Sequence, residues 1–201
     1  MKTLVSQLQR EHRNLDKLVG LLSRFPAPPS ALPPAPSEIN LLVDVLFYLT
    51  QFPDVHHHPV EDRIVAALRS KKALPADLGE EIERQHHVLA RQGRELMRDL
   101  ESAAREETVS WAQLPLEIRL YAERLRHNMM VEELSLFPLA VAMLDASDVQ
   151  AIGADLAQAP SDPLFDHTAT TRFADLHRVI ATEAGCGCFE ERSPSLPARP
   201  A

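Results

Sequence analysis

Histidine and carboxylate side chains recur along this chain at spacings that could hold a metal ion. His57 precedes Glu61 by four residues, and His127 precedes Glu132 by five. Residues four apart lie about 40° apart around a helix, so His57 and Glu61 would point the same way. Imidazole nitrogen and carboxylate oxygen, without thiolate, suit iron, manganese or zinc better than a soft metal. The candidate metal ligands are His12, His57, Glu61, His86, His127 and Glu132.

The histidine triplet that begins at His56 admits two registers. Neighbouring residues are rotated by about 100° in an α-helix, so His56 and His58 would flank His57 and point elsewhere. His58 and Asp62 are nevertheless also four residues apart. Spacing alone therefore does not choose between a His57/Glu61 pair and a His58/Asp62 pair.

The step from His127 to Glu132 does not fit a regular helix. Five residues correspond to a rotation of about 140°, so these side chains could share a metal only with long reach, local under-winding or a π-bulge. Prolines lie near both candidate pairs, because Pro59 comes two residues after His57 and Pro138 six after Glu132. Each proline removes a backbone donor and would bend its helix near a ligand.

Four segments with apolar residues three and four apart, the helical period, carry these side chains. They run from about Leu4 to Phe25, from about Ser37 to Ser70 with an interruption at Pro53, from about Pro75 to Glu106, and from about Ser110 to Leu144. Four long helices with short connections pack most simply as an up-down-up-down four-helix bundle, so we predict an all-α fold of this kind. Such bundles build metal sites from imidazoles and carboxylates that project into the core.

Local signals mark the ends of these helices. Six prolines between Pro26 and Pro36 predict a stiff, extended connector over residues 26–37. Ser37 with Asn40 offers an N-cap for the second helix, and the stretch 110–113 offers a capping box for the fourth.

The chain beyond the fourth helix differs in composition. We expect the bundle to occupy residues 1–145 and a short helical C-terminal extension to occupy 146–185. Residues 186–201 include three prolines and few apolar side chains, so we expect a disordered tail. The tail holds Cys186 and Cys188, which could bind a metal, form a strained redox disulfide or be two exposed thiols. Two thiolates alone do not close a zinc site, and we expect two exposed thiols.

The overall composition is that of a soluble globular protein. The chain has 201 residues, of which 45% are hydrophobic and 25% charged, and a formal net charge of −8. This charge argues against nucleic acid or an anionic membrane as a partner, because both recruit basic patches. No apolar run reaches the roughly 20 residues that cross a bilayer, and the first residues lack the apolar stretch of a signal peptide. We therefore expect a cytoplasmic protein.

The stretch His57-His58-Pro59-Val60-Glu61-Asp62 resembles the HHPxED signature of hemerythrin-like (HHE cation-binding) domains. Three further stretches are similar to the remaining blocks of that family: Glu11-His12, Gln85-His86, and His127 followed by Glu132-Glu133-Leu-Ser-Leu-Phe137-Pro138. The four blocks occur in the family's order over about residues 4–144, which makes the resemblance specific.

This resemblance implies a four-helix bundle around a non-haem centre of two iron ions, oxo- or hydroxo-bridged when oxidised. By the same resemblance the terminal imidazole ligands would be His12, His57, His86 and His127. Glu61 and Glu132 would be the carboxylates that bridge the two irons. The family signature also favours the His57/Glu61 register.

Two features distinguish this chain within the family it resembles. Oxygen-carrying hemerythrins have a fifth histidine four residues after the helix-three ligand, where this chain has Ala90. The remaining four histidines and two glutamates are similar to the set in the branch that repairs iron centres, and open positions on the irons would favour reaction over reversible O₂ carriage. The five-residue step from His127 to Glu132 is instead that of hemerythrins proper, whereas the repair branch is spaced by four.

We expect a metal-binding protein that binds or senses O₂, NO or peroxide, or handles iron in the stress response, rather than a dedicated enzyme. The alternatives are an iron donor for repair of damaged iron–sulfur centres and a small di-iron oxidoreductase, with a metal-free helical scaffold as a remote one. A ferritin-like oxidase is disfavoured, because only Glu83-x-x-His86 fits its repeated Glu-x-x-His pattern. The expected partners are a small diatomic ligand or peroxide, and a separate protein for signalling or iron transfer.

Overall fold

The computed structural model of the chain describes residues 1–24, 34–105, 113–153, 162–165 and 170–183. Within these ranges the chain is helical and contains no strand, so the prediction of an all-α fold is confirmed for them. The helices are α1 (Lys2–Ser23), α2 (Pro36–Gln51), α3 (His58–Ser70), α4 (Ala76–Ala104), α5 (Leu114–Val131), α6 (Phe137–Met143), α7 (Ala146–Gly153) and α8 (Ala174–Glu183). Two π-helical segments, η1 (Pro53–His57) and η2 (Glu132–Leu136), and a 3₁₀ turn, η4 (Thr171–Phe173), complete the elements.

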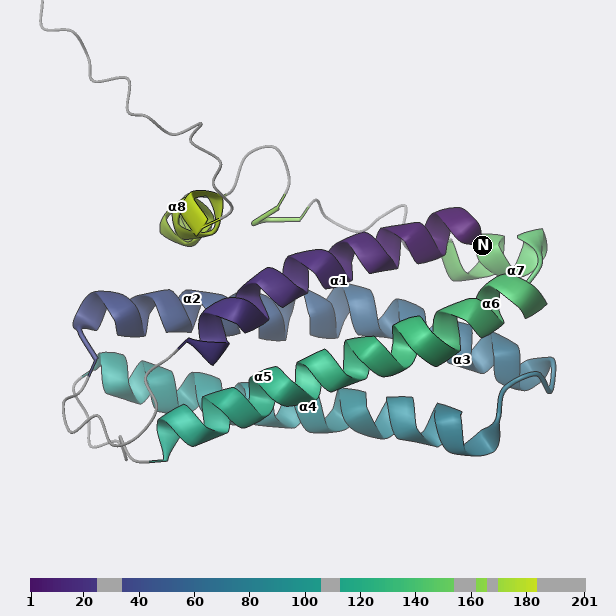
Figure 1. The fold of residues 1–201 in the computed structure, drawn as a ribbon, viewed down its shortest axis with the longest axis horizontal. Helices are drawn as coiled ribbons and strands as arrows, with labels where there is room; N and C mark the ends of the chain where they lie inside the picture. Colours follow the sequence, from purple (N-terminus) through teal and green to yellow (C-terminus); the bar gives the residue numbers. More distant parts are fainter. Residues whose placement is uncertain (25–33, 106–112, 154–161, 166–169, 184–201) are drawn as a thin grey trace, which may run out of the picture.

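The long helices lie side by side as a helical bundle (Figure 1). The segment η1 joins α2 to α3, and η2 joins α5 to α6, so each of these pairs continues in one direction along the bundle. Contacts between α1 and α5, α2 and α4, and α4 and α5 hold the bundle together. Within the described ranges, none of the helices combines the length and the apolar character needed to span a membrane.

The start of α2 differs from the prediction. Residues 26–33 of the predicted connector and residues 110–112 of the predicted capping box lie outside the described ranges. The helix begins at Pro36 and not after Ser37, with Ala35 as its N-cap residue. The Glu38 carboxylate accepts a hydrogen bond of 2.8 Å from the Ala35 backbone N–H. Proline suits the first helical position because its fixed φ is helical and the missing N–H has no partner there.

Two apolar clusters fill the bundle and leave a polar layer between them. On α1, Leu15 and Leu18 belong to one cluster, and Leu4 and Leu8 belong to the other. His12 lies between these two sets and is 2% exposed. The candidate metal site therefore occupies a buried layer part-way along the bundle.

The helices α2 and α4 approach each other closely at Gly93. A Cβ atom at this position would lie 2.7 Å from Thr50 Cγ2 and 3.4 Å from the ring of Tyr121. Real side chains do not tolerate the shorter separation, so glycine is what allows the two helices to pack here.

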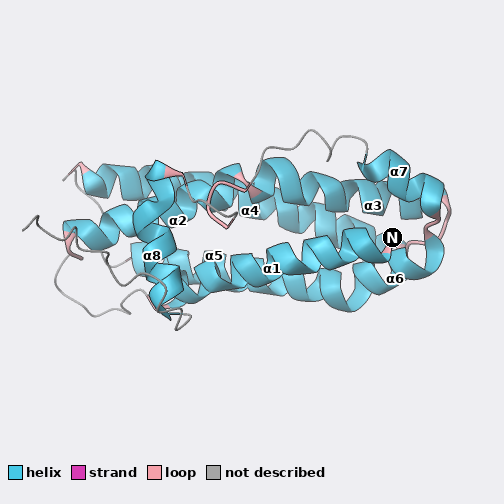
Figure 2. Cartoon of the chain, turned by 90° about the horizontal axis from the view of Figure 1, so that it is seen from above, coloured by secondary structure: helices cyan, strands magenta, loops and turns pink. Residues whose placement is uncertain are grey.

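The described part of the C-terminal extension packs on the bundle as two helices (Figure 2). Ile152 of α7 is buried, and its carbonyl oxygen accepts a hydrogen bond of 3.3 Å from Arg63 on α3. Figure 1 shows α8 almost end-on, so this helix runs across the bundle. Leu176 of α8 is buried in the same cluster as Tyr48 of α2. The predicted disordered tail, with both cysteines, lies outside the described residues, and its role stays a prediction.

Candidate metal centre

Six histidine and glutamate side chains from four parts of the bundle meet in the buried polar layer. Glu61 and Glu132 are 0% exposed, which is exceptional for carboxylates unless a cation or hydrogen-bond donors face them. The six residues are His12 on α1, His57 at the end of η1, His58 and Glu61 on α3, His86 on α4, and Glu132 at the start of η2.

One half of the cluster contains the rings of His12 and His57. The Nε2 atom of His12 lies 3.3 Å from Glu61 Oε1 and 3.5 Å from Glu132 Oε2. His57 Nε2 lies 3.2 Å from the same Oε1 atom of Glu61. Both imidazoles therefore approach Glu61 Oε1, and His12 also approaches Glu132 Oε2.

The other half contains His58 and His86, whose rings are stacked with centroids 4.4 Å apart. His86 Nε2 lies 2.9 Å from Glu132 Oε1 and 3.6 Å from Glu61 Oε2. One nitrogen of His58, one of His86 and one Glu61 oxygen all lie within 4.8 Å of one another. Each glutamate thus presents one oxygen to each half of the cluster, as a carboxylate that bridges two metal ions would.

The donor atoms of the cluster are arranged to bind metal ions rather than to form hydrogen bonds with one another. The Nε2 atoms of three histidines, both oxygens of Glu61 and Oε2 of Glu132 are buried and have no hydrogen-bond partner within the described residues. Two ligand atoms about 2.1 Å from one metal and at right angles to each other are about 3 Å apart, close to the separations observed. The three histidines with this unpaired nitrogen are His12, His57 and His58.

A carboxylate outside the cluster faces the Nδ1 atom of every one of the four imidazoles. The four pairs are His12 with Glu133 at 3.0 Å, His57 with Glu11 at 2.7 Å, His58 with Asp54 at 3.1 Å, and His86 with Asp62 at 2.8 Å. An Nδ1–H that donates to a carboxylate leaves Nε2 as a free lone pair directed at the centre. Metal-binding histidines are commonly held in this way, so the outer carboxylates orient a ligand set.

The π-helical segment η1 explains why His57 and His58 both face inward. A π-helix has more residues in each turn than an α-helix, so successive residues are rotated by less than about 100°. The segment ends at His57, whose successor donates its backbone N–H to the Pro53 carbonyl. Pro59 follows directly, and the wider turn accommodates a residue that has no N–H to donate.

The second π-helical segment repeats this arrangement at Glu132. Here Phe137 donates its backbone N–H to the Glu132 carbonyl, and Pro138 follows. The π-bulge considered from the sequence is therefore present, but it begins at Glu132 and does not lie between His127 and Glu132.

The structure does not bring His127 to the cluster. Its side chain is exposed and lines a pocket between α4 and α5. Because α5 is a regular helix up to Val131, the residue four before Glu132 faces the glutamate, and that residue is Asn128. Asn128 is 1% exposed and donates a hydrogen bond of 2.7 Å to Glu132 Oε1.

Comparison with known proteins agrees with this geometry. The family model described as the hemerythrin HHE cation-binding domain matches residues 3–140, which includes all six clustered residues. The chain belongs to the hemerythrin HHE cation-binding family. No curated protein and no solved structure gives a significant match to it. Metal binding is the property that this hemerythrin domain and its His/Glu groups support together.

Neighbouring carboxylates raise the pKa of two buried imidazoles of this hemerythrin domain. Burial would lower the pKa of His57, but the carboxylates of Glu61 and Glu11 outweigh it and raise that pKa to about 10. Burial likewise opposes Asp62 and Glu132 at His86, and these carboxylates raise its pKa to about 10. The surrounding carboxylates therefore stabilise the protonated, positively charged forms of His57 and His86.

Burial and neighbouring charges also set the pKa of three other groups of the centre. Burial lowers the pKa of His58, against the opposing effect of Asp54. Burial would raise the pKa of Glu61, but the imidazoles of His57 and His12 hold it well below its usual range. At Glu132, burial and the neighbouring Glu61 charge raise the pKa.

Sequence reasoning considered His58 only as a partner of Asp62 in an alternative register. It missed Asn128 and the pairing of the outer carboxylates with the imidazoles of the hemerythrin centre. The four-residue step from Asp54 to His58 is a local signal that could have revealed one of the four pairs. The pairing of Glu133 with His12 joins residues 121 positions apart, so only the tertiary structure reveals it.

Proposed function

We propose that this hemerythrin domain is a non-haem di-iron protein whose centre lies in the buried His/Glu cluster. The observation that carries the proposal is the set of four imidazoles, each with a carboxylate at Nδ1, grouped around the two buried glutamates Glu61 and Glu132. Two divalent ions would bring four positive charges to a cluster that contains two carboxylates and has four more around it. We also propose that the long helices form the up-down-up-down four-helix bundle of this family.

The proposed ligand set assigns two imidazoles to each ion. His12 and His57 would bind one ion, and His58 and His86 the other, while Glu61 and Glu132 would bridge them. This set keeps five of the six ligands expected from the sequence and replaces the exposed His127 with His58.

The donor set supports iron that reacts with small molecules. Two histidines with a carboxylate and open positions are typical of non-haem iron sites that use O₂. Bound iron would supply one-electron redox chemistry and an open position for a diatomic molecule or peroxide. Phe137 stacks on the ring of His12 with centroids 5.3 Å apart and contributes an apolar wall that limits access of water. We therefore propose binding or sensing of O₂, NO or peroxide in the cytoplasm.

The test loads the purified full chain with ferrous iron under anaerobic conditions and removes unbound metal. Elemental analysis should then find two irons per chain. Mixing the reduced protein with O₂, NO or hydrogen peroxide in separate stopped-flow runs should change its absorption spectrum for at least one of the three. A protein that retains no iron, or one zinc in its place, would show that the proposal is wrong.

A further inference from the structure

A pocket of about 320 Å³ lies between α4 and α5, beside the polar layer. Gln85, Val88 and Leu89 line it from α4, and Arg124 and His127 line it from α5. Gln85 directly precedes His86 on α4, so the pocket lies at the level of the candidate centre along the bundle.

A chain of hydrogen bonds leads from this pocket to Glu132. Gln85 Nε2 donates to Glu81 Oε1 at 2.6 Å, which directs Oε1 of Gln85 toward α5. Asn128 Nδ2 then donates to Gln85 Oε1 at 3.2 Å and to Glu132 Oε1 at 2.7 Å. Asn128 therefore stands between the wall of the pocket and a carboxylate of the centre.

The same contacts fix the orientation of the Asn128 amide. Both neighbours of Nδ2 are acceptors, so the opposite atom, Oδ1, is the carbonyl oxygen. Oδ1 is buried and has no hydrogen-bond partner in the part of the chain that the structure describes. A buried carbonyl without a donor is costly, so this atom is ready to accept a hydrogen bond from a molecule that enters.

The Asn128 side chain also differs in length from that of its counterpart, His57 at the end of η1. Four residues before Glu61 stands His57, whose Nε2 atom reaches within 3.2 Å of that glutamate. Four residues before Glu132 stands Asn128, and an amide is shorter than an imidazole. The α5 side of the centre therefore has a hydrogen-bonding group where the α3 side has a ligand.

We propose that the pocket between α4 and α5 is the passage to the His86 side of the centre for small molecules that donate a hydrogen bond, and that Asn128 Oδ1 accepts that bond. The inference rests on the proposed function and narrows it. Hydrogen peroxide and water carry an O–H donor, whereas O₂ and NO do not. Peroxide is therefore the favoured reactant among the three molecules considered above.

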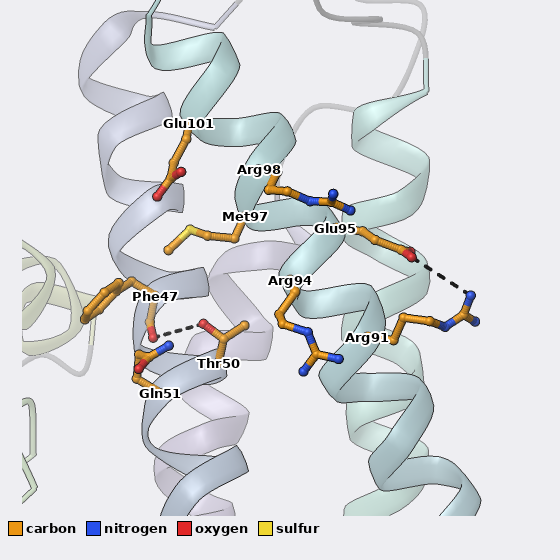
Figure 3. Close-up of a pocket in the computed structure, with 9 residues that line it drawn as sticks. All are labelled: Phe47, Thr50, Gln51, Arg91, Arg94, Glu95, Met97, Arg98 and Glu101. Carbon is orange, nitrogen blue, oxygen red and sulfur yellow. Dashed lines mark hydrogen bonds and ion pairs between the residues drawn. The ribbon is translucent and has the colours of Figure 1, made fainter.

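The first experiment measures access of water to manganese in the loaded protein. Bound Mn²⁺ accelerates the relaxation of water protons only if water exchanges with the site. Val88→Trp fills the pocket without touching the centre, and should lower the relaxivity per bound Mn²⁺ several-fold. The matched control is Met97→Trp, also on α4, which lies among residues of a separate pocket of about 540 Å³ between α2 and α4 (Figure 3).

The control variant should keep the relaxivity of the wild type. Equal relaxivity of Val88→Trp and wild type, at equal bound Mn²⁺, would overturn the passage while leaving the metal site intact. Failure of the wild type to retain any divalent metal, iron included, would instead contradict the proposed function, and the passage with it.

The second experiment tests the acceptor itself. Asn128→Leu removes the amide at similar volume, and should reduce the rate of reaction of the reduced iron protein with hydrogen peroxide by about tenfold relative to its rate with O₂, equivalent to about 1.4 kcal/mol. Gln92→Leu is the control, because Gln92 is another buried amide, bonded to the Glu117 carbonyl at 3.2 Å. Iron content is measured for each variant, and an unchanged ratio of the two rates in Asn128→Leu would overturn the role of Oδ1.

Discussion

The metal-free protein should lose stability as the pH rises above neutral. His57 and His86 keep a pKa of about 10 in the folded chain, against 6.5 for an ordinary histidine, because neighbouring carboxylates outweigh the effect of burial. Between these two values the folded chain holds protons that the unfolded chain releases. Their contribution to stability is therefore complete below about pH 6.5 and is lost as the pH rises through about 10.

The size of the effect follows from the number of protons retained. Each imidazole that stays protonated only in the folded state makes the free energy of unfolding fall by up to about 1.4 kcal/mol per pH unit. For both imidazoles, the change from pH 7.5 to pH 9 would approach about 4 kcal/mol. His58 acts outside this window, because burial lowers its pKa below the ordinary value.

Urea unfolding of the chelator-treated protein at pH 7.5, 8.2 and 9 measures this change directly. Zinc-loaded protein is the comparison, and its stability should vary much less, because metal-bound Nε2 atoms have no proton to lose. The variant His57→Gln should show about half of the wild-type slope, since one of the two protonated rings is gone. Stability that stays constant or increases between pH 7.5 and 9 in the metal-free protein would refute this reasoning.

Three substitutions test individual positions. His58→Ala should reduce the iron content from two to one per chain, whereas His127→Ala should leave it at two, as measured by elemental analysis; equal losses would place His127 in the centre. Asp62→Asn should weaken binding of the more labile iron by about 10- to 100-fold in a chelator competition, because it removes a carboxylate that orients a ligand, and unchanged affinity would contradict that role. Gly93→Ala should destabilise the protein by about 1–3 kcal/mol in urea unfolding, because α2 leaves no space for the methyl group, whereas the control Gly20→Ala, with open space around it, should not.

The fold class was predictable because long apolar patterns with helical spacing dominate the sequence. Local rules also located the interruption at Pro53, and they raised a π-bulge as one of three options before Glu132, since proline and the five-residue step each conflict with a regular helix. The start of α2 was misplaced by two residues, because Glu38 supplies the cap from inside the helix and no capping side chain precedes it.

Prediction was less complete for the cluster, because it assumed regular helical rotation throughout. That assumption pointed His58 away from the core, whereas the π-helical turn before it brings both neighbouring histidines inward. The same assumption, applied correctly to α5, would have favoured Asn128 over His127, but an asparagine is not an obvious metal-site residue. The remaining groups, such as Glu133 against His12, are brought to the cluster by packing between distant helices. Sequence spacing does not predict such contacts.

The central claim is that two metal ions share Glu61 and Glu132 in the buried layer. The most direct measurement is anomalous diffraction at the iron edge from crystals of the anaerobically loaded protein. The account predicts two iron peaks in each chain, one beside His12 and His57 and the other beside His58 and His86. A single peak, no peak, or iron bound at the exposed His127 would contradict it.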